Sequence, residues 1–132
     1  ATSKTLRPSL RSFNANLPAV VVFPEGGGNP DGVLQPLQSG ALLMAVQAGV
    51  PVIPCAVINT NRVLPYGGTR LLRSAEPVQV IFGEAIEVSE FGTGKTGVEA
   101  ATRILTERLA EMLDQPVPEG SHIPHALRGP QR

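Results

Sequence analysis

A glutamate followed by three glycines is the stretch of this 132-residue sequence whose residue types best suit chemistry: Glu25, Gly26, Gly27 and Gly28. Glycines adopt backbone conformations closed to other residues and let a ligand approach the main chain closely. The Glu25 carboxylate can accept a hydrogen bond from a substrate hydroxyl or pair with an arginine, but it can equally cap the turn by binding amides. The spacing alone gives these functional and structural uses of Glu25 equal weight.

Apolar segments on both sides of this turn predict the elements that position it. Residues 20–23 are continuously apolar, which is typical of a strand buried on both faces. Residues 51–58 predict a second buried strand, with its two prolines at an edge or a bulge. Between them, residues 36–47 predict a helix that Gly49 ends in the left-handed conformation. If the first turn of this helix points toward the glycines, its free amides form an anion site.

The remaining sequence predicts further elements of the same layer. Residues 59–76 read as a long loop, residues 78–82 as a third strand, residues 86–88 as a short fourth strand, and residues 98–113 as the strongest helix. Strand, helix and strand in this order predict an α/β fold with a mainly parallel sheet of about four strands and flanking helices. Ligands of such sheets bind beyond the carboxyl ends of the strands, where Glu25 is expected.

The two ends of the sequence differ from its middle. Leucines and a phenylalanine within residues 6–17 recur at helical spacing and predict a short helix. After Asp114 the sequence has four prolines and two glycines, and we expect residues 115–132 to be largely disordered. The expected organisation is an α/β domain part over residues 1–114 and a tail over residues 115–132.

Composition argues against several classes of protein. Eleven basic and eleven acidic residues give a formal net charge of zero, and aromatic residues make up only 4% with no tryptophan. A neutral chain has no net positive electrostatic field to attract DNA, and it has few aromatic side chains on which bases could stack. Nucleic acid is therefore not expected as a partner. No apolar run approaches the roughly 20 residues of a membrane span. No secretory leader is evident, and we expect a cytoplasmic protein.

The single cysteine, Cys55, cannot form an internal disulfide. A cysteine nucleophile needs a nearby base, and both histidines, His122 and His125, lie in the tail. We therefore expect Cys55 to pack in the core as a small hydrophobe.

The order of several short motifs resembles the glycerolipid acyltransferases, enzymes similar to 1-acylglycerol-3-phosphate acyltransferase. The matching motifs are Phe23-Pro24-Glu25-Gly26 with Asp31-Gly32, Pro36-Leu37 and Ser39-Gly40-Ala41 (the third motif block), Val50-Pro51-Val52-Ile53-Pro54 (the fourth), Leu64-Pro65, and Val80-Ile81-Phe82-Gly83-Glu84. The resemblance covers about residues 19–91, which is the C-terminal half of the family's domain. It implies transfer of an acyl group from acyl-CoA or acyl carrier protein to lysophosphatidic acid in phospholipid biosynthesis, without a cofactor. It also allows a peripheral membrane contact through the N-terminal part of that domain, and hence membrane association of the full-length protein.

On this resemblance the substrate-binding residues fall into two groups. Glu25, Gly26, Gly27 and Gly28 form the acceptor side, and Val50, Pro51 and Pro54 shape the floor of the site. The family usually has Glu-Gly-Thr-Arg at the acceptor turn, so glycine stands here where its phosphate-holding arginine is expected. Arg62, Arg70 or Arg73 could replace that arginine, although loop arginines are more often solvated.

A second departure concerns the chemistry itself. The family carries a histidine followed five positions later by an aspartate, and none of the 19 residues before Val20 is a histidine or an aspartate. No catalytic residue is therefore assigned in this sequence, and we expect the 132 residues alone to be inactive, as a fragment or a truncated product. The alternative is a non-catalytic binding or interaction domain on the same scaffold.

One further motif imitates a nucleotide-binding loop. Residues 92–96 read Gly-Thr-Gly-Lys-Thr, but the full pattern needs a glycine at Ser89. We set this interpretation aside and expect Lys95 to be a solvated charge.

Overall fold

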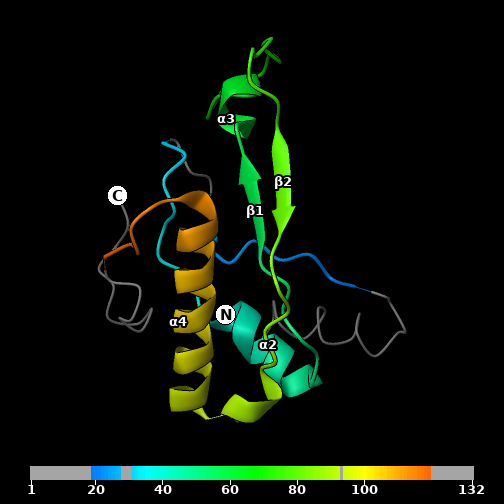
Figure 1. Ribbon diagram of the computed structural model, residues 1–132, viewed down its shortest axis with the longest axis vertical. Coiled ribbons are helices and arrows are strands. Elements are labelled where there is room, and N and C mark those ends of the chain that lie inside the picture. Colours follow the sequence, from blue (N-terminus) through cyan, green and yellow to red (C-terminus); the bar gives the residue numbers. More distant parts are fainter. Residues whose placement is uncertain (1–18, 28–30, 93, 120–132) are drawn as a thin grey trace.

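The structure is a computed structural model that describes residues 19–27, 31–92 and 94–119. Its elements follow in the order α2 (Gly40–Ala48), β1 (Cys55–Ile58), α3 (Thr60–Val63), β2 (Gln79–Phe82), the 3-10 helix η1 (Ser89–Phe91) and α4 (Lys95–Leu113). The long helix α4 packs against α2, β1 and η1, and the β1–β2 hairpin projects away from α2 with α3 at its far end (Figure 1). The predicted α/β class is confirmed.

One stripe of α4 supplies much of the core. Its buried apolar residues recur at three- and four-residue spacing: Val98, Ala101, Leu105, Leu109 and Ala110. Thr102 and Thr106 are buried on the same helix, and their hydroxyls donate to the carbonyls of Val98 and Thr102 at 2.7 and 2.8 Å. These bonds satisfy the hydroxyls without a partner from another element, so both threonines can be buried at low cost. The helix predicted over residues 98–113 is confirmed and begins three residues earlier.

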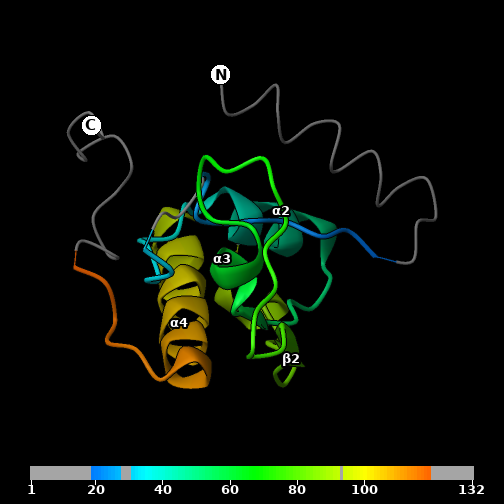
Figure 2. The same ribbon diagram turned by 90° about the horizontal axis from the view of Figure 1, so that it is seen from above.

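Helix α2 ends as predicted but begins later. Gly49 has a φ of 66°, and its backbone N–H bonds to the carbonyl of Val46 at 3.2 Å. The predicted start at Pro36 is wrong, because residues 33–38 are extended and the helix begins at Gly40. Leu34 and Leu37 are both buried from this extended segment. Their three-residue spacing imitates a helix, but their backbone forms none and passes beside α4 before it enters α2 (Figure 2).

The sheet differs from the predicted parallel arrangement. Strands β1 and β2 pair antiparallel, with Cys55 opposite Phe82 and Ile58 opposite Gln79, and a single antiparallel bridge joins Val52 to Ile86. The two strands lie where sequence predicts them, and the short fourth strand is reduced to that bridge. Parallel neighbours need a crossover, usually through a helix of several turns, whereas here only the four-residue α3 and a loop connect the strands. The chain therefore returns as a hairpin.

Two predictions of burial are wrong. Residues 20–23 form no strand, and Val21 and Phe23 are 81% and 79% exposed. Among the described residues β1 and β2 pair only with each other, so no strand runs beside 20–23 to bond its backbone. Cys55 is exposed because side chains alternate along β1, and Ala56 is the residue that faces the core.

The ends of the chain are described only in part. The helix predicted over residues 6–17 lies outside the described residues, as does most of the predicted tail. Gln115, at the start of that tail, forms two side-chain hydrogen bonds and is not disordered. Within the described ranges, no helix has the length and apolar character needed to cross a bilayer.

Candidate functional site

A tight turn closes between Phe23 and Gly26, where the Gly26 N–H donates to the Phe23 carbonyl at 3.2 Å. Gly26 has a φ of 73°, and a Cβ placed there would overlap Nε2 of Gln38. Only glycine fits this position without displacing its neighbour. The backbone N–H of Gln38 also donates to the Pro24 carbonyl at 2.8 Å. The turn is thus fixed against the extended segment 33–38.

Glu25 lies in this turn and is half-buried. Its Oε2 accepts a hydrogen bond of 2.8 Å from the backbone N–H of Gln35, ten residues further along. The carboxylate therefore binds an amide of the following segment. The prediction that Glu25 follows a buried strand is wrong, because residues 20–23 form no strand.

Gln115 holds the same segment from the opposite end of the chain. Its Oε1 accepts from the Leu34 N–H at 2.7 Å, and its Nε2 donates to the Gly32 carbonyl at 3.0 Å. The side chain reaches this position because Asp114 ends α4 in the left-handed conformation. No motif in the sequence marks Gln115, and the sole signal is an amide side chain directly after the strongest helix. An amide suits this role because it both donates to and accepts from an extended backbone.

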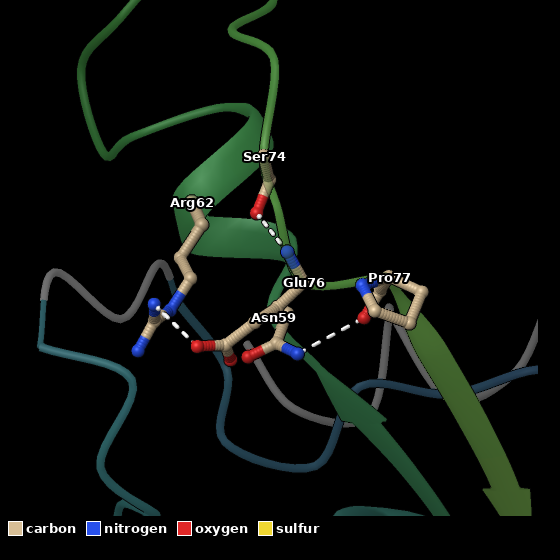
Figure 3. A network of polar contacts seen from close by, with 5 residues as sticks. All are labelled: Asn59, Arg62, Ser74, Glu76 and Pro77. Atoms are coloured by element: carbon tan, nitrogen blue, oxygen red, sulfur yellow. Dashed lines mark hydrogen bonds and ion pairs between the residues drawn. The ribbon is translucent and has the colours of Figure 1, made fainter.

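Arg62 lies on α3, where its Nη1 forms an ion pair of 3.0 Å with Oε1 of Glu76 (Figure 3). Both side chains are more than half exposed, at 57% and 55%. An exposed pair of this kind contributes about 0–1 kcal/mol. Arg62 can therefore exchange Glu76 for another anion at little cost.

The start of α3 approaches the segment that follows the glycine turn. A Cβ on Gly32 would lie 3.1 Å from Nδ2 of Asn61, which is the neighbour of Arg62 in sequence. Of Arg62, Arg70 and Arg73, Arg62 is therefore the one next in sequence to a residue, Asn61, that approaches Gly32. Arg70 and Arg73 lie further along the loop and are exposed.

The three residues predicted to shape the floor have different surroundings. Pro54 is fully buried, and its carbonyl accepts from the Gly83 N–H at 2.9 Å. Val50 is half-buried against the core, whereas Pro51 is exposed. Packing therefore accounts for Pro54 and Val50 but not for Pro51, and a role of the three in substrate binding stays a prediction.

The other predicted positions lie at the margin of the described region. Gly27 is exposed, and a Cβ there would have no neighbour within 4 Å. Gly28 and both histidines lie outside the described residues. In the part of the chain that the structure describes, no cluster of three or more histidine, cysteine, aspartate or glutamate side chains could hold a metal ion.

Comparison with known proteins identifies related sequences over most of the chain. A family model described as Acyltransferase matches residues 2–58. The 1-acyl-sn-glycerol-3-phosphate acyltransferase of Salmonella typhimurium is 31% identical over 116 residues, which are 87% of this chain and 46% of that protein. The chloroplastic 1-acyl-sn-glycerol-3-phosphate acyltransferase BAT2 of Brassica napus is 37% identical over 68 residues, covering 52% of this chain and 20% of that protein. The chain therefore spans less than half the length of either relative.

A solved structure shares the fold. The crystal structure of the 1-acyl-sn-glycerophosphate acyltransferase PlsC from Thermotoga maritima superimposes with a TM-score of 0.62 at 24% identity, covering 81% of this chain and 43% of that one. The sequence comparisons support an acyltransferase family similar to 1-acylglycerol-3-phosphate acyltransferase for this chain.

Proposed function

We propose that this chain supplies the acceptor side of a domain that transfers an acyl group from acyl-CoA or acyl carrier protein to lysophosphatidic acid. The observation that carries the proposal is the Phe23–Gly26 turn, because it has the acceptor motif of the family and is fixed to the segment that follows it. The reaction and the acceptor are those of the related 1-acyl-sn-glycerol-3-phosphate acyltransferases, as their names state. We expect a protein that works in the cytoplasm at a membrane surface, where lysophospholipids are found.

In this reaction the acceptor hydroxyl attacks the thioester carbonyl while a general base removes its proton. An ester bond forms, the C–S bond breaks, and the base returns the proton to the sulfur, so the carrier leaves as a free thiol. The histidine–aspartate motif of the family provides that base, and it lies upstream of the motifs found in this sequence. The share of this chain is binding and orientation, since Glu25 and Gly26 set the shape of the turn. A mainly parallel sheet of about four strands is then expected of the whole domain, with β1 and β2 as one part of it.

Arg62 is our candidate for holding the acceptor phosphate. Glycines stand at positions 27 and 28, where the family motif has threonine and arginine, so the usual phosphate ligand is lacking. The Arg62–Glu76 pair is exposed and weak, and α3 approaches the segment next to the turn. Arginine can bind a phosphate through two parallel hydrogen bonds, so the acceptor phosphate is a suitable partner for Arg62.

The second candidate function is a non-catalytic binding domain on the same scaffold. It is favoured by the absence of a histidine–aspartate motif from the 132 residues. Such a domain binds lysophosphatidic acid or another partner and transfers nothing.

Transfer of labelled acyl groups to lysophosphatidic acid tests the two functions. The chain is assayed alone and with a separately produced N-terminal half of the Salmonella relative, the half in which the family pattern places the histidine–aspartate motif. We expect transfer only from the mixture, and none when the motif histidine of the added half is changed to alanine. Missing the base should cost roughly 100- to 10,000-fold in rate.

Two outcomes contradict the proposal. Turnover by the chain alone, abolished by Glu25→Ala, makes Glu25 the base. Binding of lysophosphatidic acid without transfer in a mixture that is shown to form a complex supports the non-catalytic domain.

A further inference from the structure

The loop between α3 and β2 projects from the molecule at the end of the hairpin that is far from α2 (Figure 1). Its large apolar side chains are exposed, with Leu71 at 77% and Tyr66 at 65%, and Leu64 and Leu72 at about half. Four large exposed apolar side chains thus fall within nine residues of one loop, which makes this loop a candidate interaction surface. We define residues 64–73 as the tip loop.

The tip loop has a fixed shape. A turn closes with the Gly68 N–H donating to the Pro65 carbonyl at 2.8 Å, and the Leu72 N–H donates to the Val63 carbonyl at 2.7 Å. At its base, Nδ2 of Asn59 donates a bond of 2.9 Å to the Pro77 carbonyl, near the exposed Arg62–Glu76 ion pair (Figure 3). The loop therefore holds its apolar side chains at the surface before any partner binds, and binding does not have to pay for ordering the loop.

The charge around the tip loop is strongly one-sided. Residues 59–77 contain three arginines and one carboxylate, Glu76, whereas the chain as a whole is neutral. Because Glu76 pairs with Arg62, the remaining positive charge belongs to Arg70 and Arg73, which directly flank Leu71 and Leu72. Strands β1 and β2 also expose apolar side chains but carry no charged residue.

We propose that the tip loop docks this protein on anionic lipid bilayers, with Tyr66, Leu71 and Leu72 entering the interface and Arg70 and Arg73 binding lipid phosphates. Apolar side chains flanked by arginines match both layers of such a surface, the acyl region and the negatively charged headgroups. A neutral apolar protein partner would leave the two arginines without a counter-charge. This inference does not depend on the proposed reaction, and it places the contact on this part of the chain.

The sequence offers a built-in reporter, because Tyr66 is the only tyrosine and there is no tryptophan. Intrinsic fluorescence of the whole chain therefore reports on the tip loop alone. We would titrate the full 132-residue chain with vesicles of phosphatidylcholine, with and without phosphatidylglycerol, carrying nitroxide-labelled acyl chains. The expected result is sedimentation with the anionic vesicles, quenching of Tyr66, and release by salt.

Variants separate the two kinds of contact. Leu71→Ser is expected to weaken binding about tenfold through lost apolar burial. Arg70→Gln with Arg73→Gln should weaken it about 30-fold at low salt. Phe82→Ser removes an exposed apolar side chain from β2, and Arg103→Gln with Arg108→Gln removes two charges from α4, so these matched controls should bind like the parent. Circular dichroism verifies that each variant is folded.

Several results would overturn the proposal. One is the absence of sedimentation with anionic vesicles, and another is sedimentation without quenching of Tyr66, which would assign the contact to another surface. If Phe82→Ser and Leu71→Ser lowered the affinity for vesicles equally, binding would be a nonspecific hydrophobic adsorption of any exposed apolar residue and not a property of the tip loop. Equal binding to neutral and anionic vesicles would remove the role of the arginines.

Discussion

Glu25 and Gly26 belong to a motif associated with substrate binding, yet each also has a structural partner in the segment that follows. The carboxylate binds the Gln35 amide, and the bare α-carbon of Gly26 leaves room for Gln38. A substitution at either residue changes the shape of the turn as well as its chemistry. Substitutions at this scale therefore need controls that separate folding from binding.

Gly26 and Gly27 provide such a matched pair. Gly26→Ala should lower the free energy of unfolding by about 1–3 kcal/mol, because alanine is strained at positive φ and its Cβ overlaps Gln38. Gly27→Ala meets open space and should change it by less than about 0.5 kcal/mol. Urea unfolding followed by circular dichroism measures both values. Equal destabilisation by the two variants would mean that the turn is not held as described.

Gly28→Arg restores the arginine of the family motif. We expect it to improve the affinity for lysophosphatidic acid by about 1.5–3 kcal/mol, because a charged bidentate contact to the phosphate is added. Calorimetric titration of the parent and the variant measures the gain, and Gly27→Arg serves as a control for charge alone. If Gly28→Arg brings no gain while Arg62→Gln abolishes binding, the phosphate is held by Arg62.

At the scale of elements, the core depends on one helix and on its connection to a distant segment. Helix α4 presents its buried stripe to α2, and Gln115 directly after it bonds to the backbone of Gly32 and Leu34. The acceptor turn is fixed to this same segment. The geometry of the turn therefore depends on where α4 ends.

Gln115→Ala should loosen that connection. The loss of two hydrogen bonds, one with a buried partner, is expected to cost about 1–3 kcal/mol. Hydrogen exchange at the Leu34 amide should accelerate more than exchange in the middle of α4. Gln35→Ala is the control, since that side chain bonds only to the nearby Val33 carbonyl. Unchanged protection of Leu34 would contradict the proposed connection.

Periodicity predicts some of these elements and fails for others, for identifiable reasons. Helix α4 was predictable because its apolar stripe persists over several turns, and the end of α2 because Gly49 adopts a positive φ. The start of α2 was not, because the buried leucines of an extended segment share helical spacing. Residues 20–23 show a further limit: an apolar run indicates that a segment is suited to burial, but not which neighbour covers it.

The candidate site was predictable only in its motif. The sequence points to Glu25 and Gly26, and their turn is present. The contacts of Gln35 and Gln38 with this turn were missed, because their bonds come from backbone N–H groups that every residue but proline has. Gln115, which bonds to Gly32 and Leu34, was missed because an amide side chain carries no spacing signal of its own.

At the scale of the whole molecule, the hairpin leaves one face uncovered. Among the described residues each strand has a single strand partner, and Val57, Val80 and Phe82 expose apolar side chains. The chain also spans less than half of its relatives' length. We expect the remaining half of the domain to cover this face.

The 132 residues alone should therefore self-associate through the hairpin. Sedimentation velocity is expected to show species larger than a monomer at micromolar concentration, and Phe82→Lys should shift them toward the monomer by placing a charge on β2. The same substitution at Val117, an exposed apolar residue after α4, is the control and should change nothing. If the parent chain is a monomer at these concentrations, the exposed apolar face of the β1–β2 hairpin does not drive self-association.

The bonds from Gln115 also set an order of events during synthesis on the ribosome. They join residues 81 and 83 positions apart, so translation must add those residues before the segment beside the acceptor turn can be secured. At about 5–20 residues per second, roughly 4–16 s pass between the synthesis of residues 32–34 and the synthesis of Gln115, which bonds to them. The acceptor turn is thus secured only after α4 has been synthesised, and a pause in translation before the codon for Gln115 would leave the turn accessible to chaperones and proteases.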